Sequence, residues 1–240
     1  MCGKFTQMAS WAEVHEYASL IGARENDEVR KYTPMARVGV VHVGENEDRL
    51  VTPMVWGFTD RAPLGRRSIR NMHARGETVD TKQTWADAFR YRRGITWARS
   101  FNEGKEHLIF DEDGDPTGKT WTEQWTMKPK NGKPIIIGVI FDTFEVGNGP
   151  EYEYVQVTVP ANAAILPITD RMPLILSEDE IELWLGELRA PLEDVKALIR
   201  TREFDPAEWD IGPEDPTKKP PRPRKKRRSE IDRPNLFSKR

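Results

Sequence analysis

The sequence predicts an α+β fold, in which a curved, mostly antiparallel sheet or barrel carries helices at its periphery. Segments with strand composition outnumber those with helical periodicity, and they follow one another in hairpin-like succession. At 240 residues the chain is long enough for one large domain with a substantial core. We therefore assign residues 1–212 to one domain and residues 213–240 to a basic, proline-rich disordered tail.

Strands are expected where β-branched and aromatic residues cluster between turn residues. The clearest is the apolar run Ile135–Phe141, which is too short to span a membrane and is typical of a buried strand. Residues 111–118 (DEDGDPTG) form a turn; they lack the full spacing and terminal Glu of a calcium loop, so we expect no metal site. The other expected strands are 38–43, 50–58, 94–101, 152–159 and 173–176.

Helices are expected where capping signals precede a helical pattern. Two S-x-x-E capping boxes begin at Ser10 and Ser177. Thr84 is expected to cap a short helix, and Pro191 is typical of a first helical position. The expected helices cover residues 10–20, 84–91, 177–188 and 191–200.

Charge is distributed unevenly along the chain. The formal net charge is −2, yet residues 218–228 (KKPPRPRKKRR) hold eight cations and no acidic residue. Four prolines between 216 and 223 prevent a helix there and favour an extended, solvated tail. A basic run of this kind usually binds polyanions, mostly nucleic acid; a solubilising tail or a localisation signal is the alternative.

Composition also indicates where in the cell the protein is located. Charged residues make up 32% of the chain, and neither a signal peptide nor a membrane-spanning run is apparent. We expect a cytoplasmic, nucleoid-associated protein with no membrane partner.

Cys2 is the only cysteine of the sequence, so an internal disulfide is excluded and a reducing compartment fits. Met1 is normally trimmed before a small residue, which makes Cys2 the mature N-terminus with a free α-amine beside its thiol. Both groups are partly deprotonated near neutral pH. Together they can trap an aldehyde as a Schiff base that closes to a thiazolidine. The alternative is a small buried residue near a terminus.

Several segments, in order over residues 1–188, resemble the SRAP family of abasic-site processing proteins. They are MCGKF at 1–5, VWGF at 55–58, HARGET at 73–78, RGITWARSFNE at 93–103, PITDRMP at 167–173 and the helix that follows. The resemblance implies a compact β-rich fold with a positive channel for single-stranded DNA. It also implies a covalent crosslink between mature Cys2 and the ring-opened aldehyde of an abasic site, as part of the DNA damage response. A lyase step, N-terminal self-processing, a monomer and no cofactor complete this expectation.

The resemblance also names candidate catalytic residues. Glu103 matches the family's catalytic glutamate; ring opening and dehydration need proton transfers, which a partly buried carboxylate can supply. Taken alone, a Glu before Gly104 is more often a turn residue. His73 occupies the position of a family Asn, with Asn71 as a substitute two residues earlier, and is otherwise a structural histidine. Thr169 occupies the position of a family His; a hydroxyl does not titrate, so we expect slow crosslink reversal or reversal that depends on His73.

DNA contacts are expected from Arg75 and Arg171, which match phosphate-binding arginines of the family, and from Thr78 in the same segment as Arg75. Lys4 replaces a family Arg, which keeps the charge but loses bidentate phosphate binding. Trp56 is either a stacking platform for a base or a core tryptophan.

Two other function classes stay open. One is a non-catalytic single-stranded DNA-binding protein on the same fold. The other is an N-terminal-nucleophile amidotransferase or peptidase, although no glutamine-holding motif is apparent. Residues 233–237 (RPNLF) resemble a sliding-clamp-binding tail. The departures from the family pattern indicate a divergent member, with a phage or other mobile element as the expected source.

Overall fold

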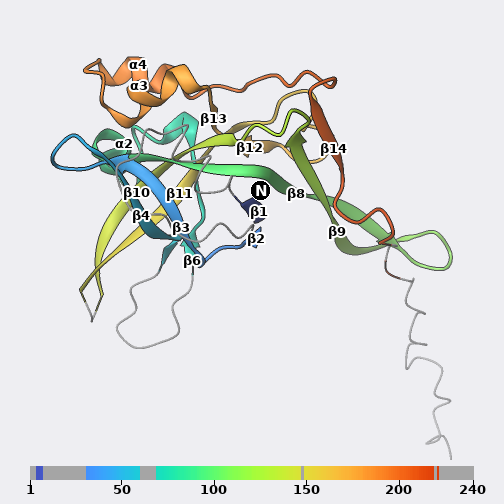
Figure 1. Cartoon of the computed structure of the whole chain (residues 1–240). Coiled ribbons are helices and arrows are strands. Elements are labelled where there is room, and N and C mark those ends of the chain that lie inside the picture. The colour runs from blue at the N-terminus through green and yellow to red at the C-terminus, as the bar shows by residue number, and fades with distance from the viewer. Residues whose placement is uncertain (1–3, 8–30, 60–68, 147–148, 219–220, 222–240) are drawn as a thin grey trace, which may run out of the picture.

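In the computed structural model, residues 4–7, 31–59, 69–146, 149–218 and 221 are described. The expected helix over residues 10–20 and the distal tail lie outside these ranges. Strands dominate the architecture (Figure 1). They are β1 (Lys4–Gln7), β2 (Lys31–Tyr32), β3 (Arg37–Val43), β4 (Arg49–Trp56), β5 (Phe58–Thr59), β6 (Ile69–Asn71), β7 (His73–Arg75), β8 (Arg93–Phe110), β9 (Pro116–Pro129), β10 (Ile135–Val146), β11 (Gly149–Pro160), β12 (Arg171–Pro173), β13 (Ile175–Leu176) and β14 (Trp209–Pro213).

The centre of the described part is a ring of strands in the order β10, β11, β4, β3 and β8, which closes because β8 also pairs with β10. Neighbours are antiparallel except β11, which runs parallel to β4 and to β7. Closure brings strands very near one another at Gly94 of β8. A Cβ there would lie 2.6 Å from Cγ1 of Val40, so only glycine fits. The expected curved, mostly antiparallel sheet is confirmed.

Large apolar side chains fill the ring and the space under the helices. Trp97, Trp184 and Phe101 are inaccessible to solvent, and the Trp184 indole N–H donates to the Gly94 carbonyl at 2.8 Å. A buried Trp whose N–H is satisfied in this way gains apolar burial without an unmet donor. The other largest fully buried side chains are Trp56, Tyr154, Phe89, Met54, Ile95, Met127, Ile137 and Ile140.

The helices are short and peripheral, with α3 and α4 together at the top of Figure 1. They are α2 (Ala86–Tyr91), α3 (Ile181–Leu185) and α4 (Leu192–Ala197), with 3-10 turns η1 (Gly76–Thr78) and η2 (Glu178–Glu180). The capping box at Ser177 is confirmed, and Gly186, at φ 89°, ends α3. The expected cap at Thr84 is wrong: Trp85 occupies the N-cap position without a side-chain cap bond.

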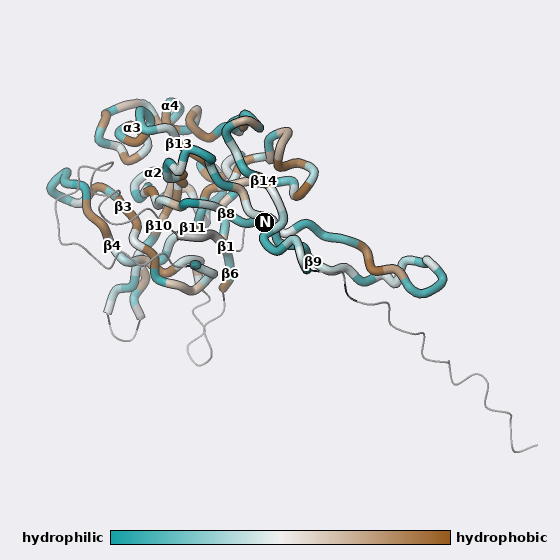
Figure 2. The backbone as a smooth tube through the Cα atoms, turned by 45° about the vertical axis from the view of Figure 1, so that its right-hand side comes forward, coloured by the Kyte–Doolittle hydropathy of each residue, from teal (hydrophilic) through white to brown (hydrophobic). Residues whose placement is uncertain are grey.

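Strands β8 and β9 form a long hairpin that projects from the body (Figures 1 and 2). The expected strand over 94–101 is therefore too short, and 111–115 is the turn at the hairpin tip, while 116–118 already belong to β9. β14 pairs with β9 along the base of the hairpin, from Trp209↔Pro129 to Pro213↔Trp125. This closing strand has no recognisable pattern in the sequence. None of the helices within the described ranges is long and apolar enough to cross a membrane.

Candidate functional site

The N-terminal strand leads directly to the candidate glutamate. β1 is antiparallel to β8, with Lys4 opposite Asn102 and Phe5 opposite Phe101. Glu103 is the next residue of β8 beyond this pairing. Cys2 and the Lys4 side chain lie outside the described part of the chain.

Glu103 is buried inside the sheet and not in a turn. Its residue is 1% exposed, and it lies opposite Trp125 of β9. The neighbouring Asn102 is equally buried and donates from Nδ2 to Thr126 Oγ1 at 2.6 Å. The turn interpretation of Glu103 is therefore wrong. Because a carboxylate is costly to bury, its position in a strand interior is a mark of a functional or strongly paired group.

A second group of candidate residues gathers around β11. β7 pairs with it in parallel, so His73 lies opposite Gln156 and Arg75 opposite Thr158. On β11 the same stretch also pairs with β12, with Pro160 opposite Arg171. His73 is half-buried, and its ring meets that of Trp56 edge-on with centroids 6.3 Å apart. The segments 73–78 and 169–173, distant in sequence, are thus brought together.

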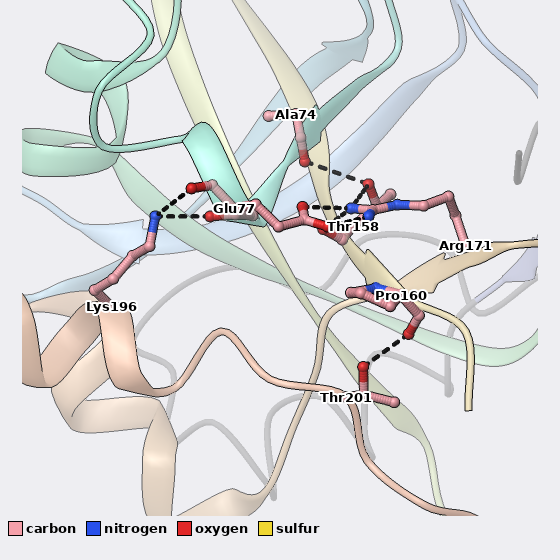
Figure 3. A network of polar contacts seen from close by, with 8 residues as sticks. Ala74, Glu77, Thr158, Pro160, Arg171, Lys196 and Thr201 are labelled. Atoms are coloured by element: carbon pink, nitrogen blue, oxygen red, sulfur yellow. Dashed lines mark hydrogen bonds and ion pairs between the residues drawn. The ribbon is translucent and has the colours of Figure 1, made fainter. Parts of the chain in front are cut away.

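Arg171 is held by the protein itself (Figure 3). Its guanidinium makes a bidentate ion pair with Glu77 and donates to the Thr158 carbonyl at 2.7 Å. The bond from Arg171 holds the pKa of Glu77 below its usual range, and the Arg171 residue is 8% exposed. These internal partners argue against the expected phosphate contact by Arg171, because its guanidinium joins η1 to β11 and β12.

Arg75 and Thr78, by contrast, are exposed. Arg75 precedes the 3-10 turn η1, and Thr78 is its last residue. The Lys196 ammonium holds this turn: it donates to the Gly76 carbonyl at 2.7 Å and pairs with Asp80. Arg75 thus lies at the surface on a rigid support, as a phosphate contact requires. Thr169, just before β12, is half-buried, and its backbone N–H donates to the Ile165 carbonyl at 3.1 Å.

Two further expectations need correction. Trp56 is fully buried, with its indole N–H 3.4 Å from the Met72 carbonyl, so it is a core tryptophan and offers no face to a base. Asn71 lies on β6 opposite Phe58 and lines a cavity of about 380 Å³ with Thr59 and Asp142. It is therefore no substitute on β7, where His73 alone takes the position beside Gln156.

The sequence analysis did not identify Gln156 as a candidate site residue. It is fully buried, and within the described ranges its amide makes no hydrogen bond. The sequence held one signal: Gln156 is a polar residue in the middle of the expected strand Tyr152–Val159. Within those same ranges no three His, Cys, Asp or Glu side chains are grouped to hold a metal ion.

Glu103 beside β1 and the segment 73–78 packed on β11 carry residues that the sequence motifs suggested for the site. Family comparison decides the relationship: the model of "SOS response associated peptidase (SRAP)" matches residues 1–211. The chain belongs to the SRAP family.

Individual relatives resemble the chain at low identity. It is 25% identical over 200 residues to the abasic site processing protein YedK of Escherichia coli (strain K12), covering 78% of this chain and 80% of that protein. It is 26% identical over 180 residues to the abasic site processing protein HMCES of Xenopus tropicalis, covering 66% of this chain and 52% of that protein. A crystal structure of a Bordetella bronchiseptica protein shares the fold, with a TM-score of 0.66, 18% identity, and coverage of 88% of this chain and 99% of that chain.

Proposed function

We propose that this SRAP protein binds single-stranded DNA and traps abasic sites by a covalent bond between mature Cys2 and the ring-opened sugar aldehyde. The observation that carries the proposal is the pairing of Lys4 with Asn102, one residue from the buried Glu103. The named relatives process abasic sites, which supplies the substrate class. We place the activity in the cytoplasm, at the nucleoid, in a protein that acts as a monomer without a cofactor.

Chain geometry supports a meeting of Cys2 with Glu103. Consecutive Cα atoms are about 3.8 Å apart, so the Cα of Cys2 lies within about 7.6 Å of the Cα of Lys4. Lys4 is itself paired with the residue before Glu103. This short separation allows an amine at the mature N-terminus to approach the Glu103 carboxylate. Met1 must be removed first, by hydrolysis of the Met1–Cys2 bond.

The chemistry needs no redox partner and releases one water. The Cys2 amine adds to the aldehyde carbon, and the carbinolamine loses water to give an imine. The Cys2 thiolate then forms a C–S bond to the imine carbon, and the nitrogen takes up a proton to complete the thiazolidine. A lyase outcome is β-elimination from the imine before the ring closes.

Glu103 is assigned the proton transfers of sugar ring opening and of carbinolamine dehydration. Its shielding from bulk water suits a group that must exchange protons with one bound sugar. His73 takes the proton role that Thr169 lacks, from its place on β7. Arg75 and Lys4 hold the phosphates on either side of the lesion, with Thr78 beside Arg75.

The proposal is tested with single-stranded DNA that bears one abasic site. An SDS-resistant adduct is expected with wild-type protein and not with intact DNA of the same sequence. Tight binding without an adduct would instead identify a non-catalytic single-strand binder. Ammonia release from glutamine would identify an amidotransferase, and its absence together with an adduct supports the crosslinking function.

A further inference from the structure

The projecting β8–β9 hairpin carries one chemically distinct face. Side chains alternate along a strand, so the odd-numbered residues of both strands share this face. The cross-strand pairs on it run outward as Phe101↔Met127, Glu103↔Trp125, Lys105↔Glu123 and His107↔Trp121. The face thus begins in the core and passes the candidate catalytic glutamate. It continues onto the projecting part of the hairpin, which we call the arm. We call residues 105–107 and 121–125 on this face the aromatic face of the arm.

Two contacts hold the side chains of this face in place, one between a cation and an aromatic ring and one between two stacked rings. The Lys105 ammonium lies 5.2 Å from the centre of the Trp125 ring, and the ring of His107 stacks on that of Trp121 at 4.8 Å and 18°. Glu123 joins them, because its Oε2 accepts from both the Trp125 indole and the His107 ring at 2.9 Å. The bond from Trp125, then that from His107, hold the pKa of Glu123 below its usual range. The Glu123 carboxylate is therefore bonded to hydrogen-bond donors within the arm.

We propose that single-stranded DNA flanking the abasic site lies along this aromatic face; the inference rests on the function proposed above. Partly exposed indoles interleaved with cations are the surface on which unpaired bases stack while phosphates find positive charge. Lys105, and Lys119 further out, supply that charge. The face is continuous with Glu103 along β8, so a DNA strand that holds its lesion there would next meet Lys105 and His107 of the arm.

The opposite face of the hairpin and its tip lack the features that would bind DNA, so the proposal concerns the aromatic face alone. The opposite face carries the exposed side chains of Leu108 and Phe110 and no aromatic–cation pair in the described residues. The tip is acidic, with Asp111, Glu112, Asp113 and Asp115, and repels phosphates. From Glu103 to His107 the strand rises about 13 Å, which accommodates only a few nucleotides. The arm therefore extends the site on one side of the lesion only.

The test compares abasic single strands that carry a flank on the 5′ side only, the 3′ side only, or neither. Equilibrium affinity is read by fluorescence anisotropy on strands whose abasic site is the tetrahydrofuran analogue, which has no aldehyde and cannot crosslink; adduct formation is scored separately with the natural abasic site. Wild-type protein should gain about tenfold or more from a flank on one side, and little from the other. Trp121→Leu should lose this gain, whereas Trp121→Phe, which keeps a ring, should retain most of it. Leu108→Ala, on the opposite face, is the matched control and should behave as wild type.

Leu and Phe at position 121 both keep an apolar side chain there, so the hairpin should still fold. Circular dichroism and thermal unfolding of each variant check this and separate loss of a DNA contact from loss of the hairpin. An equal flank gain in wild type, Trp121→Leu and Trp121→Phe would overturn the proposal. So would a change in oligomeric state of Trp121→Leu without a change in flank gain, which would assign the face to a second copy of the chain. If no adduct forms with any strand but the flank gain still depends on Trp121, the crosslinking function fails and the DNA path stands.

Discussion

Arg75 and Arg171 lie on strands that both pair with β11 near Thr158, yet their environments differ. The Arg171 guanidinium is enclosed and bonded to Glu77 and Thr158, while Arg75 is exposed. A buried guanidinium that is bonded to a carboxylate and a carbonyl stabilises the fold, whereas an exposed guanidinium can exchange water for phosphate. Two arginines with the same motif-based expectation therefore receive different roles.

Arg75→Ala should weaken binding to single-stranded DNA and reduce the slope of log affinity against log salt by about 0.7. Arg171→Ala should instead lower the free energy of unfolding by about 1–3 kcal/mol, measured with urea. The assignment is contradicted if Arg171→Ala is as stable as wild type and loses more DNA affinity than Arg75→Ala.

Glu103→Gln keeps the size of the side chain and removes its capacity to exchange protons. Crosslinking at saturating DNA should slow about 100-fold or more, while the dissociation constant for DNA changes little. Single-turnover gel kinetics give the rate. Glu106→Gln is the matched control, because Glu106 lies on the opposite face of β8 and is exposed. An unchanged rate in Glu103→Gln would return this carboxylate to a structural role.

At the scale of elements, strands with apolar or alternating sequences were predictable and the arm was not. Val38–Val43 and Ile135–Phe141 face the core, so hydrophobic burial alone marks them, as β3 and β10 confirm. Most of β9 is polar and only Met127 of it is buried, so no burial pattern marks it; cross-strand pairs with β8 define it instead. The short β7 is likewise defined by its partner β11.

The same limit applies to the site. Sequence motifs led us to predict Glu103, His73 and Arg75 as site residues, because their spacing resembles that of the family. They did not distinguish a core Trp56 from an exposed one, since an indole on a strand suits both environments. They also gave no sign that Glu77 would occupy the fork of Arg171, because that ion pair joins residues 94 positions apart.

Glu180 connects η2 to the segment after α4 through ion pairs with Arg200 and Arg202. Burial alone would raise the pKa of Glu180. The Ser177 backbone N–H and Arg202 bonds, with the charges of Arg202 and Arg200, outweigh burial and lower the pKa below its usual 4.5. A lowered folded pKa means that the stabilisation is complete above the unfolded value and is lost as pH falls through the folded one.

Glu180→Gln should therefore reduce the free energy of unfolding by about 1–3 kcal/mol at pH 7, and the difference from wild type should shrink in more acidic solution below pH 4.5. Urea unfolding across this pH range gives both values. Glu178→Gln in the same turn is the control. Glu178 is exposed, and its carboxylate lies 3.9 Å from the Lys133 ammonium, which is too far for a hydrogen bond. A pH-independent difference for Glu180→Gln would contradict the assigned ion-pair role.

For the whole molecule, the basic tail follows β14, which ends at Pro213 and is continued by a bond from the Glu214 N–H to the Gln124 carbonyl at 2.7 Å. A truncation that preserves the sheet must therefore lie beyond these residues. Deleting residues 219–240 removes seven of the eight cations in the run while leaving β14 complete.

This truncation should weaken binding to intact single-stranded DNA and flatten its salt dependence, because each phosphate contact contributes about 0.7 to the slope for single strands. Crosslinking at saturating DNA should be retained. Replacing the same cations with Gln in the full-length chain gives the control for length. An unchanged salt slope in both variants would assign the tail to a protein partner, such as a sliding clamp, or to localisation.

The bond to Cys2 is the central claim, and mass spectrometry of the adduct tests it most directly. Wild-type protein is incubated with a single strand bearing one abasic site, digested with protease and nuclease, and the modified peptide is sequenced. We predict a peptide that begins at Cys2, lacks Met1, and carries the sugar with the loss of one water. Cys2→Ala should give no heat-stable adduct. An adduct mapped to another residue, or an equally stable adduct from Cys2→Ala, would contradict the account.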